Sequence, residues 1–118
     1  MKINQEGLSL DISVLMAKWA DFGITHKRMN KQNTHIDKVK VFPNPDEQVD
    51  PVVEVKFSRS EVIDRLRQGT TFITVYKDSE GRYRRGETVR TVLINKIEFI
   101  KTLDDKTIKD NLGELPDF

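Results

Sequence analysis

The sequence predicts an α+β fold: a twisted antiparallel sheet or partial barrel of five to six strands, one capped helix, and a second helix near the N-terminus. Short runs of alternating apolar residues, separated by turn residues, recur along most of the chain, and such runs are typical of strands. One capping box opens a short helical pattern, and one apolar stripe has helical spacing. A length of 118 residues fits a single domain.

Residues 1–23 are predicted to form an N-terminal arm followed by an amphipathic helix over residues 11–22. The apolar stripe of this helix follows the i, i+3, i+4, i+7 spacing of one helix face and consists of Ile12, Leu15, Met16, Trp19 and Phe22. Gly23 suits the position after a helix end. Residues 8–14 also alternate as a strand would, but the longer stripe favours the helix.

The same stripe is a candidate interaction surface. A helical stripe of this kind is normally core, but outside the main domain it also suits docking, because aromatic residues and Met are enriched at interfaces. The candidate partner interface consists of Ile12, Leu15, Met16 and Trp19. Through it we expect the chain to bind a protein partner or to form a homo-oligomer.

Residues 24–118 are predicted to form a single β-rich domain. Its strands are expected over residues 24–29, 35–42, 52–57, 71–77, 88–94 and 97–101. In the second strand the apolar residues change phase once, between Ile36 and Val39, which predicts a β-bulge. The run at 88–94 carries apolar residues on both faces, so we expect a central strand there.

One helix is expected to pack across the sheet, over residues 60–68. Ser58 and Glu61 have the spacing of a capping box, and Gly69 supplies a left-handed stop. Asn95-Lys96 is predicted to be a two-residue hairpin turn. The predicted core consists of Trp19, Ile36, Val39, Val41, Val53, Val55, Phe57, Val62, Leu66, Phe72, Val75, Leu93, Phe99 and Leu115.

The composition excludes several kinds of site. There are no cysteines, which removes disulfides, thiolate metal sites and thiol nucleophiles. No apolar run approaches the ~20 residues of a membrane-spanning helix, and the first residues lack the apolar stretch of a signal peptide. We therefore expect a cytoplasmic protein without membrane contact.

The remaining residues show no catalytic or metal-binding pattern. The serines lack a Gly-x-Ser-x-Gly setting, no glycine-rich phosphate loop is present, and no carboxylate pair can be singled out for acid–base catalysis. His26 and His35 are the only histidines, and a metal site would need further ligands. The acidic residues after Lys101 lack the spacing of a calcium loop, so Asp110 is expected to hold a turn. We expect no enzyme activity, no metal and no cofactor.

Basic residues gather at one predicted hairpin. This candidate nucleic-acid or phosphate site consists of Arg82, Tyr83, Arg84, Arg85 and Arg90. Arginine forms forked contacts to phosphate, and tyrosine stacks on bases. The alternative is a solvated hairpin whose charges protect strand edges and are partly neutralised by Glu80 and Glu87. A second basic stretch consists of Lys27, Arg28, Lys31, Lys38 and Lys40.

The residues from Glu98 onward form a recognisable pattern. The stretch Glu98–Thr102, the pair Asp104-Asp105 and the stretch Asp110–Phe118 are similar to the end of a small bacterial family, domain of unknown function 3892. More weakly, residues 33–39 and 58–69 resemble the first strand and the helix of that family. The resemblance covers about residues 24–118 and is specific mainly in 98–118. It implies a bacterial or phage-borne protein with this β-rich fold and brings no catalytic residue.

These observations lead to three expectations about function. The first is a small non-catalytic interaction module that binds a protein partner or self-associates. The second is nucleic-acid binding through the basic hairpin. The third is binding of a small phosphorylated ligand, since a few arginines on a β scaffold are enough for that chemistry.

Overall fold

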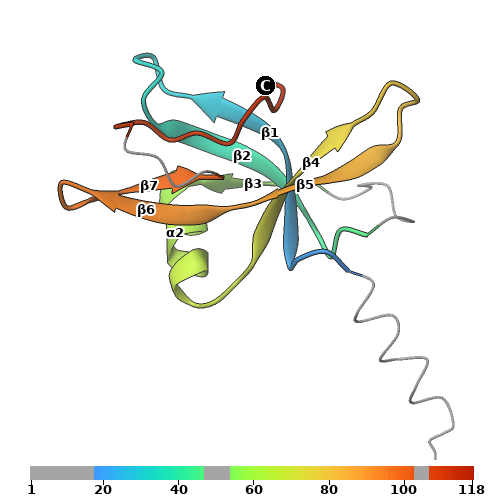
Figure 1. The fold of residues 1–118 in the computed structure, drawn as a ribbon, viewed down its shortest axis with the longest axis horizontal. Coiled ribbons are helices and arrows are strands. Elements are labelled where there is room, and N and C mark those ends of the chain that lie inside the picture. The colour runs from blue at the N-terminus through green and yellow to red at the C-terminus, as the bar shows by residue number, and fades with distance from the viewer. Residues whose placement is uncertain (1–17, 47–53, 103–106) are drawn as a thin grey trace, which may run out of the picture.

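The computed structural model describes residues 18–46, 54–102 and 107–118. Within these ranges the chain forms one helix and seven strands, so it is mostly β (Figure 1). In chain order they are β1 (Phe22–Met29), β2 (Ile36–Pro43), β3 (Val55–Ser58), α2 (Arg59–Arg67), β4 (Phe72–Lys77), β5 (Tyr83–Thr88), β6 (Arg90–Ile94) and β7 (Ile97–Lys101).

Five strands form one sheet in the order β3-β2-β1-β4-β5, and β6 and β7 form a second, two-stranded sheet. The prediction of a purely antiparallel sheet was wrong, because β1 pairs in parallel with β4. That parallel pairing is short: only Phe22–Ile24 and Phe72–Thr74 take part. Beyond it β1 and β4 diverge, so that the five-stranded sheet splits into two arms (Figure 1).

The predicted bulge between β1 and β2 is confirmed. Arg28 lies opposite Lys38, but the next residue, Met29, lies opposite Ile36, which leaves Asp37 as the extra residue. The bulge shifts the phase of β2, and Ile36 and Val39 both reach the core as a result. The phase change in the apolar pattern was therefore a reliable local signal.

The helix α2 has the predicted capping box. The Ser58 hydroxyl accepts from the Glu61 amide at 3.2 Å, and the Glu61 carboxylate accepts from the Ser58 amide at 2.9 Å. These hydrogen bonds lower the pKa of Glu61. At the other end Gly69 has φ +92°, the left-handed conformation expected of a helix stop. α2 thus begins and ends where local sequence signals predict.

Buried side chains form one cluster on each face of the five-stranded sheet. The larger cluster includes Val62 and Ile63 of α2, and we call that face of the sheet the helix face. The smaller cluster, on what we call the outer face, consists of Ala20, Phe42, Ile73 and Val75, with Trp19 and Tyr83 packed partly buried against it. Neighbours along one strand, such as Phe72 and Ile73, belong to different clusters, because side chains alternate across a sheet.

Most of the predicted core is buried, with two exceptions. Buried as predicted are Ile36, Val39, Val41, Phe57, Val62, Phe72, Val75, Phe99 and Leu115, and Trp19 and Leu66 are partly buried. Val55, on the edge strand β3, is 42% exposed, and Leu93 is 66% exposed. Val53 lies outside the described residues. An edge strand and a two-stranded sheet offer too few neighbours to cover an apolar side chain on both faces.

The predicted central strand at 88–94 was wrong. The chain is extended from Tyr83 to Ile94, but it is divided at Val89, whose amide donates to the Phe72 carbonyl at 2.9 Å. β5 before that point belongs to the large sheet, and β6 after it pairs only with β7. The hairpin turn at Asn95 and Lys96 is as predicted, with φ values of +51° and +67°.

The predicted helix over residues 11–22 does not reach its expected end. Residues 18–21 are irregular and Phe22 opens β1, whereas residues 11–17 lie outside the described part. The Asp21 carboxylate accepts from the Thr71 amide at 2.9 Å, which holds this segment against the start of β4. Gly23 is a strand residue instead of a helix stop. Glycine is needed at this position, because a Cβ there would lie 2.8 Å from Val75 and 2.9 Å from Phe42.

The last segment of the chain packs against the sheet. Leu112 and Leu115 are buried on the helix face. Beyond them the chain runs parallel to β1, where the Lys27 amide donates to the Pro116 carbonyl at 2.9 Å and the Phe118 amide donates to the Lys27 carbonyl at 3.2 Å. Residues 116–118 therefore lie along the part of β1 that does not pair with β4.

Candidate nucleic-acid interface

The predicted basic hairpin is neutralised at its tip. Arg84 donates to the Asp78 carboxylate at 2.8 Å, and Arg82 pairs with both Asp78 and Glu80. Asp78 also accepts from the amides of Glu80 and Arg82 at 2.9 Å each. The amide of Arg82, the guanidinium of Arg84 and the Glu80 amide lower the pKa of Asp78 to about 2. Two of the predicted phosphate ligands are thus committed to holding a turn.

The other three predicted residues do not form one site with these arginines. Tyr83 packs on the outer face, with the Lys77 ammonium 5.3 Å from its ring centre. Arg85 lies opposite Val75 and shares the outer face with it. Arg90 is exposed at the start of β6, in the other sheet. The hairpin therefore contributes only Tyr83 and Arg85 to the outer face.

A denser set of cations lies on β1, β2 and β3. Arg28 is directly opposite Lys38, and Lys40 is directly opposite both His26 on β1 and Lys56 on β3. Directly opposed residues of antiparallel strands share a face, and like charges in such positions are destabilising. We call the set Arg28, Lys38, Lys40 and Lys56 the basic face. It is part of the outer face, on the side of the sheet opposite α2.

An aromatic ring lies at the centre of the basic face. The Phe118 ring has the Arg28 guanidinium at 4.6 Å, the Lys40 ammonium at 4.9 Å and the Lys56 ammonium at 5.9 Å from its centre. His26 contacts the same ring edge-on at 6.4 Å. Arg28 also donates to the main-chain oxygen of Phe118 at 3.0 Å. Cation–π contacts of this kind partly offset the repulsion among the three cations.

Carboxylates near the basic face are occupied elsewhere. Glu54 accepts from the Thr25 hydroxyl at 2.9 Å, and Asp117 lies 3.5 Å from the ammonium of Lys27. Lys38 makes a minor contribution to the lowered pKa of Glu61, whose main partner is Ser58. Within the described ranges, no ion pair joins a carboxylate to Lys38, Lys40 or Lys56. Three of the four cations of the basic face therefore have no ion-pair partner among the described residues.

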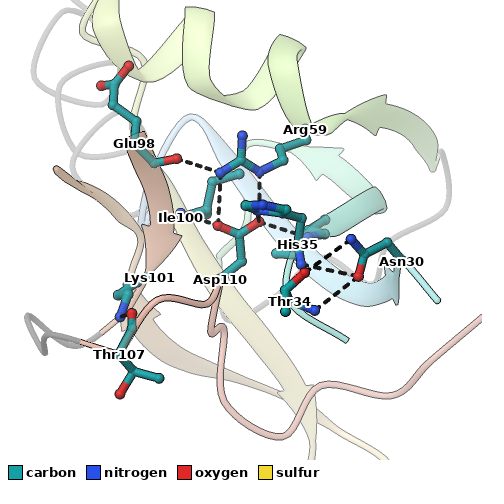
Figure 2. A network of polar contacts seen from close by, with 10 residues as sticks. Asn30, Thr34, His35, Arg59, Glu98, Ile100, Lys101, Thr107 and Asp110 are labelled. Carbon is teal, nitrogen blue, oxygen red and sulfur yellow. Dashed lines mark hydrogen bonds and ion pairs between the residues drawn. The ribbon is translucent and has the colours of Figure 1, made fainter. Parts of the chain in front are cut away.

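The buried carboxylate of Asp110 forms a separate polar cluster (Figure 2). It accepts from the amides of Ile36 at 2.7 Å and Ile100 at 2.8 Å, and from the Arg59 guanidinium at 2.8 Å and 3.2 Å. The Asp110 amide in turn donates to the Thr34 carbonyl at 2.8 Å. Asp110 therefore joins separate elements instead of holding its own turn, and its carboxylate accepts only from groups of the fold itself.

The two histidines occupy separate environments. His35 stacks on Phe99 with ring centres 5.4 Å apart, and its Nδ1 lies 3.7 Å from Asp110 Oδ2 (Figure 2). His26 lies on the other side of the sheet, where its Nδ1 is 2.8 Å from the Thr25 hydroxyl. In the described part of the chain, no group of three or more His, Asp or Glu side chains is arranged to hold a metal ion.

The sequence of this domain matches one known protein family. A family model described as "Protein of unknown function (DUF3892)" matches residues 23–116. The chain belongs to the DUF3892 family. The match runs from the second residue of β1 to Pro116, so the DUF3892 region includes the split sheet, α2 and the Asp110 cluster. No curated protein and no solved structure matches the chain. No helix of the described residues is long and apolar enough to span a membrane.

Sequence reasoning found only part of the basic face of this DUF3892 domain. The second basic stretch contains Arg28, Lys38 and Lys40, all of which belong to the basic face. Lys27 points instead to the last segment, where its ammonium donates to the Leu115 carbonyl at 2.9 Å. Lys56 and Phe118 were missed. The available signal for Lys56 was its alternation with the apolar residues of its strand, but no local pattern links it to Lys40.

The predicted partner interface is not tested by the fold. Ile12, Leu15 and Met16 lie outside the described residues. Trp19 is half-buried against the outer-face cluster. The DUF3892 match starts at residue 23, so this stripe also lies outside the family region.

Proposed function

We propose that this DUF3892 domain is a non-catalytic nucleic-acid-binding module that contacts phosphates with its basic face. The observation that carries the proposal is the pair of like-charge oppositions, Arg28 with Lys38 and Lys40 with Lys56. Such pairs weaken a sheet unless an anion compensates them. At about 5 Å, two unit charges in water repel by about 0.8 kcal/mol. A bound phosphate backbone would offset this repulsion, because each phosphate attracts both cations of a pair.

The extent of the site across three strands supports a polymeric anion. Arg28, Lys40 and Lys56 come from three adjacent strands and lie around the Phe118 ring, and Lys38 extends the positive charge along β2. Phosphate contacts of this kind give affinity without base specificity and depend strongly on salt. Arg85 and Lys77 extend the positive charge of the same outer face toward β5.

The test is fluorescence anisotropy with a labelled single-stranded oligonucleotide at two salt concentrations. Four phosphate contacts predict a slope of about −2.8 in log K against log salt, which is about fiftyfold weaker binding at ~200 mM than at ~50 mM salt. The double variant Lys40→Gln, Lys56→Gln should halve the slope to about −1.4. Both side chains point outward from the sheet, so the variant should fold.

A matched control removes the same charge elsewhere. Arg90→Gln, Lys96→Gln also deletes two exposed cations, but from the β6–β7 hairpin. This variant should retain the wild-type slope. No binding at ~50 mM salt, or equal losses in both double variants, would contradict a role for the basic face.

A protein partner is a second candidate function, favoured by a different surface. Leu93 and Ile97 are 66% and 47% exposed on the β6–β7 hairpin. Together with Ile63 they line a groove between the hairpin and α2, whose polar lining includes Arg67 and Lys96. Exposed apolar side chains next to a groove are a common feature of interaction sites. This surface supports the expected interaction module independently of the N-terminal stripe.

A further inference from the structure

The split between the two arms of the sheet contains a pocket. β1 and β4 stop pairing after Ile24 and Thr74, and a pocket of about 110 Å³ lies just beyond that point. Its lining includes His26 from β1, Lys77 from β4, Tyr83 from β5 and Pro116 from the last segment. The pocket thus exists because two strands diverge, and each of its walls is part of a paired strand or of a segment bonded to one.

His26 is oriented in this pocket by a chain of hydrogen bonds. The Thr25 hydroxyl donates its single hydrogen to Glu54 at 2.9 Å. The contact of 2.8 Å between His26 Nδ1 and the Thr25 oxygen therefore requires Nδ1 to be the donor. In the neutral imidazole this assignment leaves Nε2 as an acceptor. The ring consequently offers a ligand one aromatic face and one defined acceptor.

Tyr83 contributes a second aromatic side chain to the pocket lining. It is half-buried, and the Lys77 ammonium lies 5.3 Å from the ring centre. Within the described residues the Tyr83 hydroxyl has no hydrogen-bond partner, so this group is available to a ligand. A pocket between aromatic side chains, with a cation and few polar groups, has the chemistry that receives a planar heterocycle.

The pocket is continuous with the basic face. His26 lines the pocket, lies directly opposite Lys40, and contacts the Phe118 ring at the centre of the basic face. A nucleic-acid strand whose phosphates lie on the basic face would therefore pass the mouth of the pocket, because His26 at the mouth is the pairing neighbour of Lys40. Bases of a duplex are paired and stacked, whereas bases of a single strand are free to enter.

We propose that the pocket between β1 and β4 receives one unstacked base of a single-stranded nucleic acid. The proposal rests on the function proposed above, since the phosphates of the same strand would lie on the basic face. It makes the domain selective for single strands over duplexes, although the basic face alone would accept both.

The experiment compares two single strands that carry the same phosphates. One is an ordinary labelled oligonucleotide, and the other has abasic residues at its central positions. The wild-type protein should bind the ordinary strand about tenfold more tightly, within the range of aromatic stacking on one base. The two strands should show the same salt slope, because their phosphate contacts are identical. A duplex of the same length should bind no more tightly than the abasic strand.

Variants of the pocket provide the internal control. Tyr83→Leu keeps an apolar side chain against the outer-face cluster, and His26→Gln keeps polarity at the mouth. Each should weaken binding of the ordinary strand to the abasic level and leave abasic binding unchanged. Unchanged abasic binding also shows that the variant is folded.

The outcomes separate the two proposals. Equal, salt-dependent binding of both strands by the wild type would overturn the base pocket and leave the basic face intact. No binding of either strand at ~50 mM salt would overturn the proposed function and this inference with it. Tight binding of a free mononucleotide that the Lys40→Gln, Lys56→Gln variant retains would overturn the single-strand proposal in favour of a small phosphorylated ligand.

Discussion

Individual cations of this protein differ in their immediate neighbours. Arg84 lies next to Asp78, and its guanidinium holds the β4–β5 turn. Lys40 lies opposite Lys56 and has only the Phe118 ring as a close attractive contact among the described residues. Both are long basic side chains on strands of the same sheet. Only the second is available to bind a phosphate, because an existing carboxylate partner must be displaced from the first.

The lowered pKa of Asp78 gives a prediction at this scale. Its ordinary value is 3.8, and the fold lowers the pKa to about 2. Because the folded pKa is depressed, the contribution of this carboxylate to stability is present above pH 3.8 and is lost as the pH falls toward 2. Carboxyl chemical shifts followed by NMR should give a midpoint near 2 for Asp78 and a higher midpoint in an Arg84→Ala variant. A wild-type midpoint near 3.8 would show that the turn network is not formed in solution.

At the scale of elements, α2 owes its start to a few adjacent residues. The capping box involves only Ser58 and Glu61, and the helix that follows has 9 residues. A helix this short is marginal alone, so its cap and its two buried residues, Val62 and Ile63, both matter. The strands differ in this respect. β1 is defined by pairing with β2 on one side and with β4 on the other, at distant positions in the sequence.

The cap predicts a measurable loss of stability. Ser58→Ala removes the acceptor for the Glu61 amide and should lower the free energy of unfolding by about 1 kcal/mol. Urea denaturation followed by circular dichroism measures the change. Ser79→Ala, in the exposed turn after β4, is the matched control and should have an effect within about 0.5 kcal/mol of zero. Equal effects of the two substitutions would mean that the cap is not formed.

At the scale of the whole molecule, Asp110 connects parts of the chain that share no strand pairing. Its carboxylate accepts hydrogen bonds from the first residue of β2, from Ile100 near the end of β7 and from the first residue of α2. These elements lie around the helix-face core, and Figure 2 shows Arg59 and Ile100 directed at the Asp110 carboxylate. The two-stranded β6–β7 sheet is too small to be stable alone, so this attachment helps to hold it to the domain.

Removal of this carboxylate should therefore destabilise the entire fold. Asp110→Ala leaves the Arg59 charge and two buried amides without their acceptor and should cost about 3–5 kcal/mol. Asp117→Ala is the control, because that side chain is 81% exposed and should contribute little. Thermal and urea unfolding measure both. A loss below about 1 kcal/mol for Asp110→Ala would contradict the role of this cluster as a tertiary connection.

Features that depend on a few neighbouring residues were readable from the sequence. The capping box, the stop at Gly69 and the turn at Asn95-Lys96 each involve residues within four positions of one another, and the bulge in β2 shows in the apolar spacing of Ile36 and Val39. Their energies are local, so the residue types alone indicate the conformation. The family pattern near the C-terminus likewise led to the correct family.

Features that depend on distant partners needed the folded chain. The parallel pairing of β1 with β4 joins residues about fifty positions apart, and the basic face joins Arg28, Lys56 and Phe118 from three separate segments. Leu93 looks like core in its strand, yet it is exposed because its sheet has only two strands. No local pattern encodes these long-range contacts, because they depend on the packing of the whole chain. The positions of most strands and three of the four cations of the basic face were therefore readable from the sequence, whereas the split of the sheet and the assembly of the binding surface were not.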